Sequence, residues 1–294
     1  MPQSDGITWS VDPVLFQIGP LTIRYYGILF ALSFFIGYSI IRSVFRREGK
    51  PESDLATLLT YMMVGTIVGA RLGHCLFYDP GYYLGNPSKM LKVWEGGLAS
   101  HGGAIGILAA LFAYTRRHPD QPYLWLLDRM VMVVALAGLL IRLGNLFNSE
   151  ILGVPTDVPW AVTFGRIDDR PRHPAQLYEA IAYGTIFVGL YRLYVQLEAR
   201  TPRGLLFGLF LVSAFGFRFL IEFVKERQAA YGSDLALSVG QILSIPLLIL
   251  GIALLARALR TGPRSPSGLQ LTGRAPACRA RSTRPPSSSQ SSHR

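Results

Sequence analysis

The stretch from residue 130 to residue 147 reads Met-Val-Met-Val-Val-Ala-Leu-Ala-Gly-Leu-Leu-Ile-Arg-Leu-Gly-Asn-Leu-Phe. A helix that crosses a bilayer needs about 20 mostly apolar residues. This stretch therefore predicts a transmembrane helix that carries Arg142 and Asn145 near one end. Because an ionisable group inside a bilayer is costly and usually serves a function, Arg142 marks the region in which to look for a site.

Six further stretches share this apolar character, at residues 25–45, 55–78, 97–114, 177–197, 204–224 and 235–259. Charged residues make up 16% of the 294 residues and the mean hydropathy is +0.31, whereas about a quarter of the residues in a soluble domain are charged. Lipid cannot hydrogen-bond an exposed backbone, which favours helices. The sequence predicts an all-α polytopic membrane protein with about seven transmembrane helices.

The distribution of Lys and Arg predicts the orientation, since these residues accumulate on the cytoplasmic side. They follow the first, third, fifth and seventh stretches, at Arg42, Arg46, Arg47, Lys50, Arg116, Arg117, Arg200, Arg203, Arg257, Arg260 and Arg264. The N-terminus is then outside and the C-terminus cytoplasmic. The loop 148–176 opposes this rule mildly, because it contains Arg166, Arg170 and Arg172 together with three aspartates.

Composition divides the chain into a seven-helix transmembrane domain, residues 1–260, and an Arg/Ser/Pro-rich tail, residues 261–294, which we expect to be cytoplasmic and disordered. The net charge of +11 arises largely in the cytoplasmic loops and this tail. Anionic lipid headgroups attract such charge. We therefore predict the lipid bilayer, and not nucleic acid, as the partner of the basic segments.

Several polar side chains interrupt the apolar stretches: Tyr26, Arg71, His74, His101, Arg142, Asn145, Glu179, Arg218 and Glu222. In the predicted topology all of them fall in the outer half of the membrane, which indicates one polar cavity opening outward. A guanidinium offers a rigid fork that matches phosphate oxygens. Two such groups near the outer face favour an anionic, amphiphilic ligand such as a phospholipid.

Structural explanations for these residues remain open. Arg218 and Glu222 are four residues apart and can form an ion pair within one helix, and Arg142 can extend to the outer headgroups. Arg71 and His74 suit structural roles at least as well as catalytic ones. Gly65, Gly69 and Gly73, and likewise Gly102 and Gly106, repeat at intervals that allow helix backbones to approach closely.

Residues 141–153, Ile-Arg-Leu-Gly-Asn-Leu-Phe-Asn-Ser-Glu-Ile-Leu-Gly, resemble the signature of the prolipoprotein diacylglyceryl transferase family. The matching positions are Arg142, Gly144, Asn145, Asn148, Glu150 and Gly153, whereas Ile141 and Leu146 depart from it. Segments 24–27, 94–103, 172–179, 217–223 and 240–246 also resemble family motifs in the same order, so the resemblance spans roughly residues 9–260. Some members have a tyrosine where this chain has Ala214.

The resemblance implies an enzyme of the bacterial cytoplasmic membrane, multi-pass, with its active site toward the outer face. Family members transfer the diacylglyceryl group of phosphatidylglycerol to the lipobox cysteine of a prolipoprotein, with no cofactor or metal. The catalytic residues it implies are His101, Arg142, Arg218 and Tyr26. Those implied to bind phosphatidylglycerol are Arg142, Asn145, Glu150, Gly153, Arg218 and Glu222. His101 suits a base for the thiol, or a group that only orients the headgroup.

Two other functions are compatible with arginines buried in a polytopic protein. One is a transporter or channel for an anionic solute, which should show polar groups in both halves of the membrane and broken helices in paired repeats. The other is a lipid-binding scaffold without catalysis, which leaves His101 without a task. The gathering of polar groups at one side favours the transferase.

Overall fold

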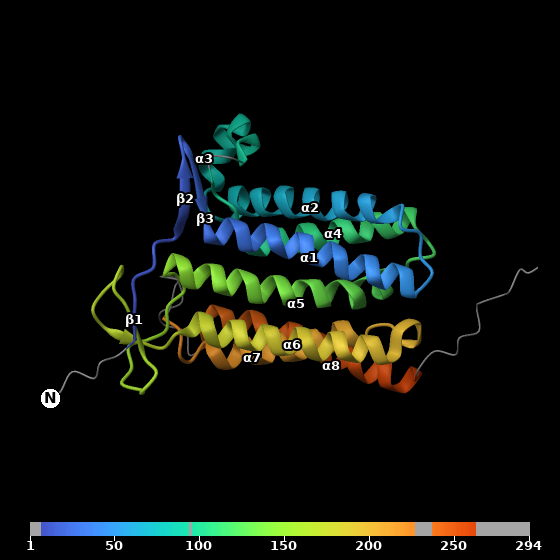
Figure 1. The fold of residues 1–294 in the computed structure, drawn as a ribbon. Helices are drawn as coiled ribbons and strands as arrows, with labels where there is room; N and C mark the ends of the chain where they lie inside the picture. The colour runs from blue at the N-terminus through green and yellow to red at the C-terminus, as the bar shows by residue number, and fades with distance from the viewer. Residues whose placement is uncertain (1–6, 94–95, 227–236, 263–294) are drawn as a thin grey trace, which may run out of the picture. The chain divides into compact units, whose positions relative to one another are not determined.

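The computed structural model describes residues 7–93, 96–226 and 237–262, and this part of the chain is mostly helical (Figure 1). The seven longer helices are α1 (Tyr25–Arg47), α2 (Asp54–Phe77), α4 (Ser100–Arg117), α5 (Tyr123–Asn148), α6 (Ala175–Leu197), α7 (Leu205–Ile221) and α8 (Val239–Thr261). Shorter ones are α3 (Pro80–Gly85), η1 (Pro87–Leu91) and η3 (Glu198–Arg200). The predicted disordered tail lies outside the described residues from position 263 onward.

The described helices have the length and composition of a polytopic membrane protein. Five of them, α1, α2, α5, α6 and α8, are long and apolar enough to cross a membrane. Helix α7 is apolar but has 17 residues, and α4 has 18. The prediction of a helical, multi-spanning protein is confirmed, whereas the number of seven spans and the orientation of the termini stay predictions.

Helices α2 and α4 pack against each other through glycine. A Cβ atom on Gly69 would lie 2.5 Å from the carbonyl oxygen of Gly102 and 2.7 Å from the Cα atom of Gly106, closer than any real side chain allows. A Cβ on Gly73 would lie 2.6 Å from the Cα atom of Gly102. The close backbone approach predicted from the glycine spacing is confirmed, and it depends on the absence of side chains.

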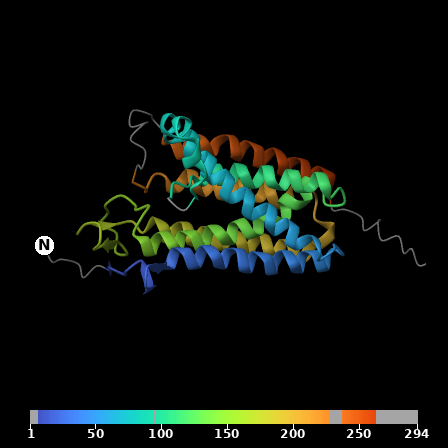
Figure 2. The same cartoon turned by 90° about the horizontal axis from the view of Figure 1, so that it is seen from above.

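Helices α1, α6 and α7 pack against α5. Helix α1 lies alongside α5 at one edge of the bundle (Figure 2), α6 packs on another side of α5, and α7 lies between α6 and α8. One apolar core joins α1, α2, α4 and α5 near the Arg-rich ends of α1 and α4, around Phe45, Leu58 and Leu126. A second joins α5, α6 and α7 around Met132 and Leu206.

A buried ionic group lies at the end of the bundle opposite Arg142. The Arg129 guanidinium is 2.9 Å from Glu48 Oε1, and the Trp125 indole N–H donates to Glu48 Oε2 at 2.7 Å. Asp128 accepts hydrogen bonds from the backbone N–H groups of Gly204 and Phe207, and so caps α7. Asp128 and Arg129 were not among the polar side chains named from the sequence, because the span was expected to begin at Met130, whereas the helix begins at Tyr123.

Short strands gather at the end of the bundle where α5 finishes and α6 begins. Strand β1 (Ile7–Trp9) pairs in parallel with β4 (Val162–Phe164), which pairs antiparallel with β5 (Pro171–Arg172). Strands β2 (Val14–Ile18) and β3 (Leu21–Arg24) form a hairpin that leads into α1 (Figure 1). The Trp9 indole donates to the carbonyl of Leu146 at 3.0 Å and ties the N-terminal segment to the last turns of α5.

Candidate active site

Arg142 lies in a hydrogen-bonded chain near the end of α5. Its Nε atom is 3.2 Å from Glu179 Oε2 on α6, and its Nη1 donates to Asn145 Oδ1 at 3.3 Å. The Asn145 amide donates in turn to Glu150 Oε1 at 2.9 Å. Because Arg142 and Asn145 are three residues apart, their side chains lie on the same side of α5. The side chain of Arg142 is 13% exposed, so its charge is largely removed from solvent.

The backbone around Glu150 turns its side chain back toward α5. Ser149 and Ile151, on either side of it, have left-handed φ angles of 53° and 60°. Such angles are uncommon for residues other than glycine, above all for a β-branched one. The carbonyl of Glu150 also accepts a hydrogen bond from Gln176 Nε2 at 2.7 Å. Strained backbone of this kind costs about 1–3 kcal/mol per residue and gathers at functional sites.

The ionic chain continues from Glu179 to the segment after α7. Lys225 Nζ is 3.5 Å from Glu179 Oε1 and 3.8 Å from Glu222 Oε1. The Ser238 hydroxyl donates to Glu222 Oε2 at 2.8 Å. A continuous group of side chains thus links α5, α6, the end of α7 and the start of α8. We call it the polar cluster: Arg142, Asn145, Glu150, Glu179, Glu222 and Lys225.

Arg218 borders the polar cluster without an ion pair to any described carboxylate. It interacts electrostatically with Lys225 and with Tyr183, and Arg142 interacts with the same two residues. The two arginines therefore act on one shared set of neighbours. The ion pair between Arg218 and Glu222 that the sequence allowed does not form. The reason is that α7 ends at Ile221 and Glu222 turns toward Ser238 and Lys225.

Gly153 holds the loop after α5 against the segment after α7. Its N–H donates to the His173 carbonyl at 3.2 Å, and Gly153 forms an antiparallel bridge with Lys225. A Cβ at Gly153 would lie 2.6 Å from His173 Cβ and 2.9 Å from the Val224 carbonyl oxygen. Any side chain at position 153 would push these strands apart and displace Lys225.

The loop arginines differ in their surroundings. Arg172 is buried, and its guanidinium bonds Asp168 and Glu226 and the carbonyl of Gly153. The hydrogen bonds from Arg172 hold the pKa of Asp168 below its usual value. Arg172 thus supports the loop that carries Gly153. The other two arginines of this loop, Arg166 and Arg170, are exposed.

Tyr26 reaches the same region from the first turn of α1. A Cβ on Gly144 would lie 2.7 Å from Tyr26 Cδ2, so the tyrosine ring packs directly on the α5 backbone. Tyr26 also interacts electrostatically with Glu150 and Arg142. The family-like glycine at position 144 thus lets Tyr26 approach the polar cluster.

His101 lies at the start of α4 and is exposed, and no described contact joins it to the polar cluster. Arg71 is 3% exposed and serves the loop before α4. Its guanidinium donates to the carbonyls of Lys89 and Met90 at 2.6 and 3.0 Å and to that of Gly96. The structure thus gives Arg71 a structural role, one of the alternatives the sequence left open.

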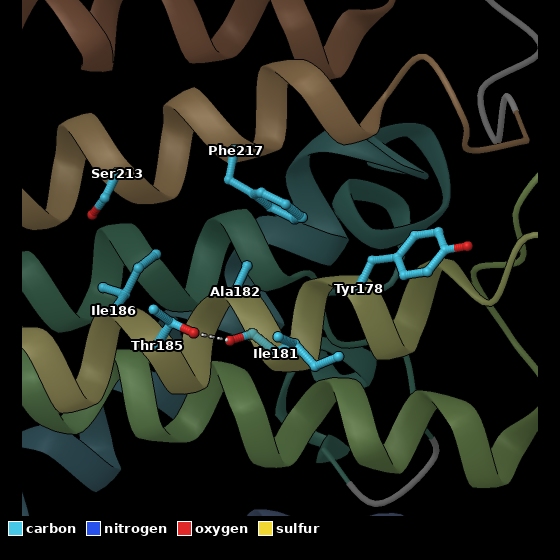
Figure 3. Close-up of a pocket in the computed structure, with 7 residues that line it drawn as sticks. All are labelled: Tyr178, Ile181, Ala182, Thr185, Ile186, Ser213 and Phe217. Atoms are coloured by element: carbon cyan, nitrogen blue, oxygen red, sulfur yellow. Dashed lines mark hydrogen bonds between the residues drawn. The ribbon is translucent and has the colours of Figure 1, made fainter.

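An open, mostly apolar groove of about 540 Å³ lies between α6 and α7 (Figure 3). It is lined by Tyr178, Ile181, Ala182, Thr185, Ile186, Ser213 and Phe217. Its α7 wall ends at Phe217, next in sequence to Arg218, and its α6 wall begins at Tyr178, next to Glu179. The groove therefore lies beside the polar cluster, but the described lining includes none of the cluster residues.

Sequence reasoning missed Lys225, although it found Arg142, Asn145, Glu150 and Glu222. Lys225 follows the apolar stretch by one residue and looked like an ordinary boundary lysine. The available signal was its position three residues after Glu222, beyond a stretch that already contained Arg218.

An apolar helix bundle of this kind defines a polytopic membrane protein, and two arginines and a lysine gather around carboxylates at one end of it. The family model described as prolipoprotein diacylglyceryl transferase matches residues 13–257, and the chain belongs to this family.

Named relatives cover most of the chain. A phosphatidylglycerol–prolipoprotein diacylglyceryl transferase of Chloroherpeton thalassium is 53% identical over 260 residues, which is 88% of this chain and 97% of that protein. Proteins of the same name from Tolumonas auensis and Bacteroides fragilis are 51% and 43% identical, and in both cases 84% of this chain is covered, with 95% and 93% of the relative.

Proposed function

We propose that this protein is a phosphatidylglycerol–prolipoprotein diacylglyceryl transferase. It transfers the diacylglyceryl group of phosphatidylglycerol to the lipobox cysteine of a prolipoprotein and releases glycerol phosphate. Membership of the family over residues 13–257 carries this proposal. The polar cluster supports it, because Arg142 and Arg218 act on the same neighbours and provide two guanidiniums for one anionic group.

The chemistry sets two requirements. The cysteine sulfur attacks the glyceryl carbon, a carbon–sulfur bond forms, and the carbon–oxygen bond to phosphate breaks, so the leaving phosphate gains negative charge. Fixed positive groups that meet this charge lower the barrier. Arg142 is suited to this role, since Glu179 and Asn145 fix its Nε and Nη1 and a guanidinium has five N–H donors in all.

The second requirement is a base for the thiol, whose pKa is about 8.5 when free. His101 is our candidate, because an imidazole can accept the proton of a thiol and this one is exposed at a helix end. Orientation of the lipid headgroup is the alternative role for His101. The pH dependence of transfer separates the two roles. If His101 is the base, His101→Gln loses the acidic limb of the pH–rate profile. If His101 only orients the headgroup, His101→Gln raises KM for the lipid.

Tyr26, Asn145, Glu150, Gly153 and Glu222 complete the proposed site. Asn145 and Glu150 position Arg142 through their hydrogen bonds, and Gly153 holds the loop that carries Glu150. Tyr26 offers a hydroxyl to the phosphate or glycerol. The proposed setting is the bacterial inner membrane with seven spans, the N-terminus outside and the polar cluster toward the outer face, in agreement with the positive charges at the opposite helix ends.

Transport of an anion is the rival function. The sequence argument against it was that polar groups gather at one side only, and the buried charges around Arg129 at the other end remove that argument. These charges are however fully paired: Arg129 is 0% exposed and contacts Glu48 through two nitrogens, and Asp128 is occupied by backbone N–H groups. These charges therefore have structural partners of their own, which favours the transferase over a transporter.

The test uses purified full-length protein, phosphatidylglycerol and a peptide that contains a lipobox, with mass spectrometry of the peptide. We expect a mass increase equal to one diacylglyceryl group on the cysteine, and none on a matched peptide with serine in its place. Anion flux into vesicles without adduct formation would support a transporter. Phosphatidylglycerol binding without either would support a scaffold.

A further inference from the structure

Lys225 is a buried cation to which the proposed reaction assigns no task. The residue is 8% exposed, and its ammonium group faces charged groups from three helices and from its own segment. These are Glu179 of α6, Glu222 just after α7, Arg142 of α5 and Arg218 of α7. A buried charge is costly unless it is well paired. The polar cluster therefore retains Lys225 at a cost, which suggests a use.

Each carboxylate that faces Lys225 also has an arginine available. The second oxygen of Glu179 is 3.2 Å from Arg142 Nε. Glu222 lies four residues after Arg218, the spacing at which opposite charges attract along a helix, yet it contacts Lys225 and Ser238 instead. A carboxylate paired with both nitrogens of a guanidinium fork occupies the donors that would otherwise bind phosphate.

The backbone fixes Lys225 between the two carboxylates. Gly153 forms a bridge with Lys225, and the flanking N–H groups of Val154 and Glu226 donate to the carbonyls of Val224 and Leu152 at 3.0 and 3.1 Å. Strand-like pairing therefore fixes the backbone from which the Lys225 side chain extends. This explains how one lysine can hold a carboxylate of α6, Glu179, and one from its own segment after α7, Glu222.

We propose that Lys225 is a positioning residue that keeps one oxygen of Glu179 off the guanidinium of Arg142 and keeps Glu222 off that of Arg218, so that donors of both guanidiniums stay available for the phosphate of the donor lipid. This inference rests on the proposed function and deepens it. When Lys225 is lost, Glu179 turns both oxygens to Arg142 and Glu222 approaches Arg218. The site then keeps its fold and loses affinity for the anionic headgroup.

The experiment measures KM for phosphatidylglycerol and kcat in the peptide assay, together with thermal unfolding, for Lys225→Met, Lys225→Gln and Lys225→Arg. We expect KM to rise about tenfold or more in the Met and Gln variants, a change that corresponds to about 1.4 kcal/mol, with a smaller change in kcat. In the Arg variant, which keeps a positive charge, KM should stay within about threefold of the wild-type value. Lys50→Met is the matched control, since Lys50 also pairs with a carboxylate, Asp120.

A second substitution separates positioning from mere structural support. In Lys225→Met/Glu179→Gln the amide cannot neutralise Arg142, so we expect KM to fall back at least threefold from that of Lys225→Met. A KM in Lys225→Met equal to that of the wild type, or no recovery in the double variant, would overturn the inference. If the Met and Gln variants fail to fold, a KM in the Arg variant raised tenfold or more overturns it as well. Wild-type protein that forms no adduct would instead contradict the proposed function itself.

Discussion

Replacement of Arg142 tests the site most sharply. In Arg142→Ala the contact to Glu179 at 3.2 Å and the hydrogen bond to Asn145 at 3.3 Å are lost. Truncation of a fully buried ion pair costs about 3–5 kcal/mol when the partner is left alone. Glu179 is not left alone here, because Lys225 remains 3.5 Å from its other oxygen. We therefore expect the free energy of unfolding to fall by about 2 kcal/mol, which is in the range of one hydrogen bond to a charged group.

The effect on catalysis should be much larger than the effect on folding. Removal of one fixed donor that meets developing negative charge lowers kcat by about 10²–10³. Arg142→Lys keeps the charge but loses the planar fork that contacts Glu179 and Asn145 at once, so we expect a loss of at least about tenfold there too. Adduct formation by mass spectrometry gives the rate, and thermal unfolding in detergent reports the fold.

The matched control is Arg116→Ala, in the last turn of α4, whose guanidinium lies over the Phe112 ring at the opposite end of the bundle. Its rate should equal that of the wild type. If Arg142→Ala, still folded, transfers within threefold of the wild-type rate, Arg142 does not stabilise the leaving phosphate and the role assigned to it is wrong.

Three further predictions concern other parts of the molecule. Gly69→Val should lower the thermal unfolding temperature, because its Cβ meets backbone atoms of Gly102 and Gly106, and overpacking costs about 1–3 kcal/mol; an unchanged temperature would show that α2 and α4 are not so close. Arg71→Ala should destabilise by at least about 1–3 kcal/mol, the cost of one buried carbonyl left unsatisfied, yet leave kcat per folded molecule unchanged, and a selective loss of kcat would place Arg71 in catalysis. Burial lowers the pKa of Lys225 below its usual value of about 10.4, so KM for the lipid should rise as the pH increases toward that lowered pKa. In Lys225→Arg, KM should stay constant over the same pH range. The same pH dependence of KM in both proteins would show that the charge of Lys225 is not needed.

The helices could be predicted from the sequence, because apolar length alone determines which segments suit a bilayer. The expected stretches 55–78 and 130–147 correspond to α2 and to the second part of α5. The errors lie at the ends. The expected stretch 204–224 runs past the end of α7 at Ile221, because Val224 leaves the helix to pair with Val154. Hydropathy cannot anticipate such a backbone pairing, which depends on a loop seventy residues away.

The site could be predicted only in part. The motif at 141–153 identified Arg142, Asn145, Glu150 and Gly153, and the structure brings their side chains and backbone to one end of the bundle. Lys225 was not predicted as a site residue, because no local pattern distinguishes a lysine that faces two carboxylates from one that faces solvent. Partners such as Glu179 and Lys225 are 46 residues apart in sequence, so tertiary packing decides whether they meet.

The direct measurement is a structure of the protein with phosphatidylglycerol bound, which locates the phosphate. We expect its oxygens within hydrogen-bonding distance of guanidinium nitrogens of both Arg142 and Arg218, with Lys225 still between Glu179 and Glu222. A phosphate bound elsewhere, or held by one arginine while the other pairs with a carboxylate, would contradict a shared anion site at this end of the bundle.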